Sequence, residues 1–112
     1  MFDDTTEPDE DELDLPTVLA ALADPGRLAT VRTLARTGES WCSQLQADSG
    51  LDCTKSTMSH HLKVLRESGV THTRVAGAHR YVSLRRDAME HRFPGLLEAV
   101  CGPRVDISTP SA

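Results

Sequence analysis

TKSTMSHHLKVLRES, residues 54–68, is the most informative stretch of this sequence, and Gly69 follows it directly. Its apolar residues Met58, Leu62 and Leu65 recur at helical spacing, so they share one side of an amphipathic helix that ends at the glycine. Another side, within an arc of about 100°, carries short or cationic polar groups: Ser56, Ser59, His60 and Lys63. One side of this helix is therefore suited to packing and the other to a polar partner.

Three further helices are expected before this stretch. Apolar residues at helical spacing predict the first over residues 15–23. Asp24-Pro25 supplies an N-cap and a proline at the first helical position, so a second helix begins there and ends at Gly38. Glu39-Ser40 opens a short third helix that continues through Ala47.

The pattern changes after the central helix. Alternating residues predict a β-hairpin over residues 70–84, with its turn at residues 76–78. A last helical region is expected over residues 86–101, interrupted by Pro94. This order of elements is typical of a winged helix-turn-helix domain, mainly α with a β-hairpin wing, and we assign it to residues 15–101.

Charge is distributed unevenly along the chain, whose formal net charge is −5. Residues 1–14 hold eight acidic residues and no basic one, and we expect them to form a disordered tail, as we do for the polar residues 102–112. Between Lys55 and Arg86 there are seven basic residues and one acidic residue, Glu67. A local excess of this kind is typical of a surface that binds the phosphate backbone of DNA.

The residue types of the central helix and hairpin predict contacts with double-stranded DNA. Short hydroxyl side chains let a helix backbone approach the major groove, imidazoles can reach base edges, and lysine or arginine neutralises phosphates. The basic side chains around the hairpin turn suit a wing that lies along or in the minor groove of DNA. The predicted DNA-binding residues are Lys55, Ser56, Thr57, Ser59, His60, Lys63 and Arg66 of the helix and Arg74, His79 and Arg80 of the hairpin. We expect His61 to be partly buried instead.

Other functional classes lack the residues that they need. The chain has no phosphate-binding glycine loop and no nucleophile–base spacing apart from the central helix, so we expect no enzyme activity. It has no apolar run long enough to span a membrane, no secretory signal and three irregularly spaced cysteines, which favours a cytoplasmic protein. A winged helix that binds proteins in place of DNA stays open as an alternative.

Three segments together resemble the ArsR/SmtB family of bacterial transcription repressors: ALADPGRLATVRTLA (21–35), KSTMSHHLKVLRESGV (55–70) and RVAGAHRYVSL (74–84). The resemblance covers about residues 16–100. It implies a homodimer joined mainly through the first and last helices, here around Leu15–Leu22 and Phe93–Val100. It also implies binding to an imperfect inverted repeat and release of the DNA when an effector binds.

The sequence departs from this family at the sites where many members sense metals. Where such members carry Cys-x-Cys before the recognition helix, this chain reads Trp41-Cys42-Ser43, which leaves one thiolate where a soft ion prefers two or three. Cys53 and Cys101 are the remaining thiols, and the second family site would draw on Asp87, His91 and Glu98, on either side of Pro94. We therefore expect no cofactor. Metal sensing by the three cysteines, thiol redox sensing by Cys42 and Cys53, and purely structural cysteines stay open, and the effector is not predicted.

Overall fold

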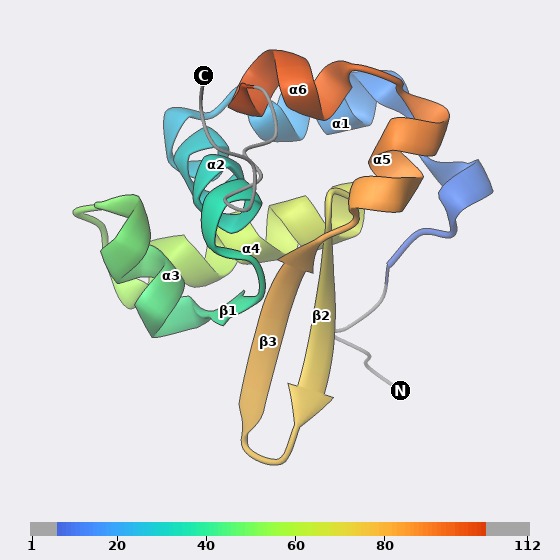
Figure 1. Cartoon of the computed structure of the whole chain (residues 1–112). Coiled ribbons are helices and arrows are strands. Elements are labelled where there is room, and N and C mark those ends of the chain that lie inside the picture. The colour runs from blue at the N-terminus through green and yellow to red at the C-terminus, as the bar shows by residue number, and fades with distance from the viewer. Residues whose placement is uncertain (1–6, 103–112) are drawn as a thin grey trace, which may run out of the picture.

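The computed structural model describes residues 7–102 of the chain (Figure 1). In chain order its elements are η1 (Glu10–Glu12), α1 (Leu15–Leu22), α2 (Pro25–Thr37), β1 (Ser40–Trp41), α3 (Cys42–Ser49), α4 (Lys55–Ser68), β2 (Thr71–Ala76), β3 (His79–Leu84), α5 (Arg86–Arg92) and α6 (Leu96–Cys101). Helices α3 and α4 form the helix-turn-helix, and β2 and β3 form the wing. The predicted fold class, mainly α with a β-hairpin wing, is confirmed.

Side-chain caps explain where three of the helices begin. Asp14, Asp24 and Thr54 precede α1, α2 and α4, and each accepts a hydrogen bond from the backbone N–H three residues further on, at 3.2, 3.0 and 3.0 Å. Helix α4 ends at Gly69, whose φ of 91° is accessible to glycine at little cost. The start and end of the most informative helix therefore follow from local sequence.

Helix α4 belongs to both hydrophobic clusters of the domain. Its residue Leu65 packs with Val18 of α1 and Met89 of α5 in one cluster. Its residue Met58 packs with Leu45 of α3 in the other, which also contains Leu34, Leu62 and Val82. Burial of these side chains is the main contribution that holds α4 in place, at roughly 1.5–3 kcal/mol for each large apolar side chain. The outward side of α4 is thereby fixed relative to the wing.

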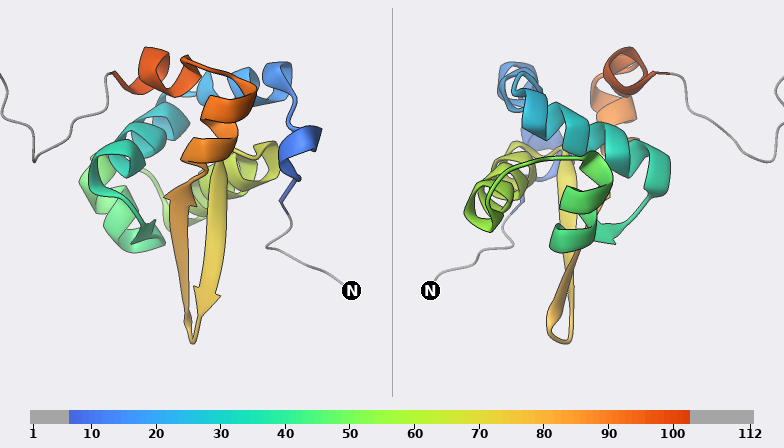
Figure 2. Two further views of the ribbon diagram at one scale, coloured as in Figure 1. Left: turned by 45° about the vertical axis from the view of Figure 1, so that its right-hand side comes forward. Right: turned by 90° about the vertical axis from the view of Figure 1, so that its left-hand side faces the viewer.

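The wing is part of a three-stranded antiparallel sheet in which β3 lies between β1 and β2. Residues 77 and 78 form the tight turn at its tip, and Gly77 adopts a φ of 61° there. The hairpin projects beyond the helices, at the end of the molecule opposite α1 and α6 (Figure 2). The expectation that the third helix opens at Glu39-Ser40 is wrong, because Ser40 and Trp41 pair with Val82 and Tyr81 as strand β1, and α3 begins at Cys42.

Residues 7–14, which we call the N-terminal strap, pack against the domain, so the expectation of a disordered tail is wrong for them. Leu13 is only 4% exposed and belongs to the first hydrophobic cluster. The guanidinium of Arg85 donates to the carbonyl of Pro8 at 2.7 Å, and His91 of α5 pairs with Glu10. The strap orders because one leucine enters the core and the carbonyls and carboxylates around it meet basic groups.

Gly69 lies directly beneath the strap. A Cβ atom at this position would lie 2.1 Å from Leu13 Cδ2 and 3.0 Å from Pro8 Cγ, so only glycine permits this approach. Residues 1–6 and 103–112, which belong to the predicted tails, lie outside the described residues. Near the C-terminal end of the described residues, the last helical region is divided into α5 and α6 around Pro94, as predicted.

Candidate nucleic-acid interface

One side of α4 presents the hydroxyl, imidazole and ammonium groups that the sequence predicted as DNA contacts. Six of these residues are exposed: Lys55, Ser56, Thr57, Ser59, His60 and Lys63. The opposite side of the same helix is buried through Met58, Leu62 and Leu65. The structure therefore brings the six together on a helix whose orientation is set by the core.

The first turn of α4 is a second polar feature of this surface. The hydroxyl of Thr54 accepts a hydrogen bond from the backbone N–H of Thr57 and donates one to its hydroxyl, both at 3.0 Å. Thr57 thus contributes to the cap as well as to the surface. The N–H groups of the first turn carry a partial positive charge, and Lys55 adds a full one, so an anion is favoured here.

Arg66 does not belong to this surface. Its residue is only 8% exposed, and its Nε atom is buried and has no hydrogen-bond partner within residues 7–102. The assignment of Arg66 to the phosphate contacts is therefore corrected. It lies in the last turn of α4, where the rest of the domain covers the helix, and only its charge had suggested a phosphate contact.

His61 is partly buried, as predicted. Its side chain is 13% exposed, and its Nε2 atom lies 3.8 Å from a carboxylate oxygen of Asp24. The carboxylate of Asp24 also accepts a hydrogen bond from the backbone N–H of Arg27, which lowers the pKa of Asp24. His61 therefore packs α4 against the start of α2.

The strand register divides the predicted wing residues between two faces. Arg74 pairs with Tyr81, and Ala76 pairs with His79, so Arg74 and His79 share a face. Arg80 pairs with Val75 and lies on the other face, which is buried nearer the helices through Thr73 and Val82. All three predicted wing residues, Arg74, His79 and Arg80, are exposed.

The outer face of the wing is formed by Trp41, His72, Arg74, His79 and Tyr81. Trp41, Tyr81 and Arg74 are direct neighbours across β1, β3 and β2. The rings of Trp41 and Tyr81 meet edge to face, with centroids 6.2 Å apart and planes at 83°. The guanidinium of Arg74 lies over the Tyr81 ring, 4.7 Å from its centroid.

The carboxylate of Glu39 binds the guanidinium of Arg74 through two hydrogen bonds. Its two carboxylate oxygens accept from Nη2 at 2.8 Å and from Nε at 3.2 Å. This hydrogen-bonded pair lowers the pKa of Glu39 and raises the pKa of Arg74. Glu39 lies between the end of α2 and β1, so the pair joins the helical part of the domain to β2.

A second glutamate holds the neighbouring basic residue of β2. The carboxylate of Glu7, in the N-terminal strap, lies 2.9 Å from Nδ1 of His72 and accepts the backbone N–H of Thr73 at 2.8 Å. Because β2 is an edge strand, this N–H would otherwise face solvent. Sequence reasoning missed both Glu7 and Glu39, since neither stands at a local spacing from its partner.

The three cysteines do not form one site. Cys42 and Cys53 are partly buried and pack against the cluster that contains Leu45 and Met58. Cys101 ends α6 and packs against the other cluster, and burial raises the pKa of its thiol. A raised pKa disfavours the thiolate, the form that binds metals and reacts with oxidants.

Asp87, His91 and Glu98 do not meet either. Asp87 lies in the first turn of α5, Glu98 lies in α6, and Nδ1 of His91 is paired with Glu10. Within residues 7–102 no group of three or more histidine, cysteine, aspartate or glutamate residues is arranged to hold a metal ion. None of the helices in the same range combines the length and the apolar character needed to cross a membrane.

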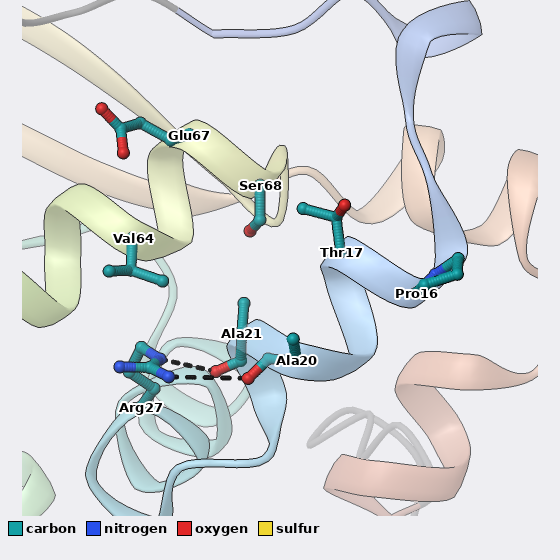
Figure 3. Close-up of a pocket in the computed structure, with 8 residues that line it drawn as sticks. All are labelled: Pro16, Thr17, Ala20, Ala21, Arg27, Val64, Glu67 and Ser68. Atoms are coloured by element: carbon teal, nitrogen blue, oxygen red, sulfur yellow. Dashed lines mark hydrogen bonds between the residues drawn. The ribbon is translucent and has the colours of Figure 1, made fainter.

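A shallow cavity of about 480 Å³ lies between α1 and α4 (Figure 3). Small apolar side chains, among them Ala20 and Val64, form much of its wall. Arg27 enters it from α2, but its Nε donates to the carbonyl of Ala21 at 2.7 Å, so this guanidinium closes the end of α1. The cavity lies apart from the wing.

Known proteins are similar to this chain in sequence and in fold. The sequence model described as "Bacterial regulatory protein, arsR family" matches residues 24–72. The HTH-type transcriptional regulator YceK of Bacillus subtilis is 42% identical over 86 residues, which is 74% of this chain and 82% of YceK. The biofilm growth-associated repressor of Agrobacterium fabrum is 33% identical over 90 residues, 80% of this chain and 74% of the repressor.

Solved structures of regulators agree with this likeness. The crystal structure of the transcriptional repressor BigR from Xylella fastidiosa has a TM-score of 0.59 and is 30% identical. The match covers 77% of this chain and 84% of BigR. The similarity therefore extends over the helices and the wing and is not limited to the helix-turn-helix.

Proposed function

Because this chain belongs to the ArsR family of bacterial regulatory proteins and is a DNA-binding transcriptional regulator, we propose that it acts as a homodimeric repressor. In this proposal α4 enters the major groove and the wing lies along the adjacent minor groove. The repressing activity is proposed from the likeness to the Agrobacterium repressor and to BigR. The operator would be an inverted repeat, because a twofold dimer presents the same surface twice.

The outward side of α4 is the observation that carries this proposal. Ser56, Ser59 and His60 are exposed on a helix whose other side is buried, so their positions are set before DNA arrives. Short hydroxyls permit close approach of the helix, and Lys55 and Lys63 can neutralise phosphates on either side of the groove. At the tip of the wing, His79 and Arg80 are proposed as contacts with the minor groove or its phosphates.

The proposed dimer uses α1 and α6, at the end of the molecule away from the wing tip (Figure 1). Leu15 and Leu19 of α1 are 41% and 46% exposed in the single chain, four residues apart and therefore on one side of the helix. Exposed leucines at such spacing are typical of a helix that packs against a partner. A second copy of the chain would cover them.

Sedimentation equilibrium tests this dimer with L19D and a matched control. L19D places a charge in the proposed interface, so we expect the dimer to dissociate to monomers. The control, V75D, introduces the same charge at Val75, which is 55% exposed on the wing, and we expect it to remain a dimer. A monomeric wild-type chain, or an intact L19D dimer, would contradict the proposed interface.

Selection from random DNA tests the function without knowledge of the operator. The full chain is mixed with randomised duplexes, and bound DNA is amplified and sequenced. We expect an inverted repeat whose half-site centres lie about 10 base pairs, or one helical turn, apart. Failure to enrich any sequence, with a folded dimer, would contradict the proposal and favour a protein-binding winged helix.

The selected DNA then allows a test of the sensing alternatives. A gel shift is run under reducing and oxidising conditions and with Zn(II), Cd(II), Ni(II) and As(III). Loss of binding only with a thiophilic ion or an oxidant would make Cys42 and Cys53 candidates for a sensor. Binding that is indifferent to all of these would leave a regulator whose signal is organic, proteinaceous or absent.

A further inference from the structure

Arg74 is a predicted DNA contact whose guanidinium is held by other residues of the protein. Glu39 occupies its Nε and Nη2 donors at 3.2 and 2.8 Å, and the ring of Tyr81 covers one flat side at 4.7 Å. The rings of Trp41 and Tyr81 meet edge to face. Carboxylates and phosphates use the same fork of arginine donors, so DNA and Glu39 compete for one group.

We infer that Glu39 withholds Arg74 from the DNA and so sets the number of phosphates that the wing contacts. This inference rests on the proposed function, in which the wing lies against DNA. It assigns a role in setting affinity to a residue outside both the recognition helix and the hairpin. While Arg74 and Glu39 are hydrogen-bonded to each other, their opposite charges cancel and the pair adds no net charge to the outer face of the wing.

The position of Glu39 explains why it competes well for Arg74. Glu39 lies between Gly38, the C-cap of α2, and β1, which pairs with β3 through Trp41 and Tyr81. Arg74 pairs with Tyr81 from the other side of β3, so the side chains of Glu39 and Arg74 meet across this strand. A carboxylate tethered this close has a high effective concentration at the guanidinium, whereas a phosphate must be brought there by DNA binding. Stacking on Tyr81 also restricts the arginine side chain, so the pair loses less conformational entropy when it forms.

The experiment compares four full-length proteins on the selected operator: wild type, E39Q, E39Q/R74Q and E90Q. E39Q keeps the shape of the side chain and an amide oxygen that can still accept a hydrogen bond, but it removes the charge. E39Q/R74Q removes one charge of each sign and so keeps the net charge of wild type. E90Q matches the charge change of E39Q at an exposed glutamate of α5, outside the wing and outside the proposed dimer helices α1 and α6.

Binding is measured by fluorescence anisotropy from 50 to 300 mM salt. We expect E39Q to bind about five- to tenfold more tightly than wild type at 0.1 M salt, with a salt slope steeper by about 0.9, the effect of one additional phosphate contact. We expect E39Q/R74Q to return to the affinity and slope of wild type, and E90Q to stay close to them. Thermal unfolding and sedimentation confirm that each variant is folded and has the oligomeric state of wild type.

Each result that differs from these expectations contradicts a different part of the inference. Equal or weaker binding by E39Q overturns the competition and makes Glu39 either neutral or a support for Arg74. An E39Q/R74Q protein that binds more weakly than wild type means that Arg74 already contacts DNA, which overturns the withholding. An equal gain in affinity by E90Q would mean that the effect of E39Q comes from the net charge of the protein and not from Arg74. Failure of the wild type itself to bind any DNA contradicts the proposed function instead.

Discussion

The exposed side of α4 and the outer face of the wing both draw their basic groups from residues 55–86, but their surroundings differ. Within residues 7–102, neither Lys55 nor Lys63 of α4 takes part in an ion pair. On β2, by contrast, His72 is paired with Glu7, and Arg74 with Glu39. The charge of α4 is therefore available to a partner, whereas part of the charge of the wing is already neutralised. A count of basic residues along the chain therefore overestimates the positive charge that the wing leaves unpaired.

The largest effect is expected where α4 reaches the bases. Changing Ser59 and His60 together to alanine removes two potential base contacts, each worth about 1–3 kcal/mol of discrimination, so specific binding should fall on the order of 100-fold. Competition of operator with random DNA in anisotropy measurements checks this, and the dimer should persist. Unchanged discrimination would mean that α4 does not read the sequence, and the contrast between α4 and the wing would collapse.

The next effect concerns phosphate contacts rather than base contacts. K55Q/K63Q should weaken binding to specific and random DNA alike, with a salt slope shallower by about 1.8 and an affinity lower by about 50-fold at 0.1 M salt. The matched comparison is E39Q/R74Q, which also changes two charged residues but should leave the slope unchanged. Equal losses in the two double variants would show that the wing and α4 contribute equally to phosphate binding.

The smallest effect is expected in the unfolding free energy. E7Q weakens the contacts of Glu7 with His72 and with the backbone of Thr73, and we expect it to lower the unfolding free energy by about 1 kcal/mol in chemical denaturation. The control is D11N, which makes the same charge change at an exposed position of the strap. A loss no greater than that of D11N would mean that the strap does not support β2.

Local sequence predicted the helices and the hairpin well. The caps at Asp14, Asp24 and Thr54 and the glycine after Ser68 act within a few residues, which is why the ends of α1, α2 and α4 were predictable to within about one residue. Strand β1 was missed because its two residues become a strand only through pairing with β3. A two-residue segment has no periodicity of its own to indicate a strand.

The candidate site was predicted in the same uneven way. Helical periodicity gathered the polar side of α4 correctly. Charge alone added Arg66, whose burial depends on the elements packed around the end of the helix. The strap was missed because an acidic segment predicts disorder unless basic groups elsewhere in the fold meet it. Leu13 was the available signal, since an isolated leucine beside the acidic run can enter a core.

The sequence by itself determined the class of the protein, the order of its elements and the side of α4 that faces outward. These properties depend on periodicity, caps and turn residues, which act over one or two helical turns. Only the tertiary structure decided which basic groups are already paired. Glu39 and Arg74 are 35 residues apart in the chain, and Glu7 and His72 are 65 apart. Electrostatic pairing depends on distance in space, and packing of the whole domain sets that distance.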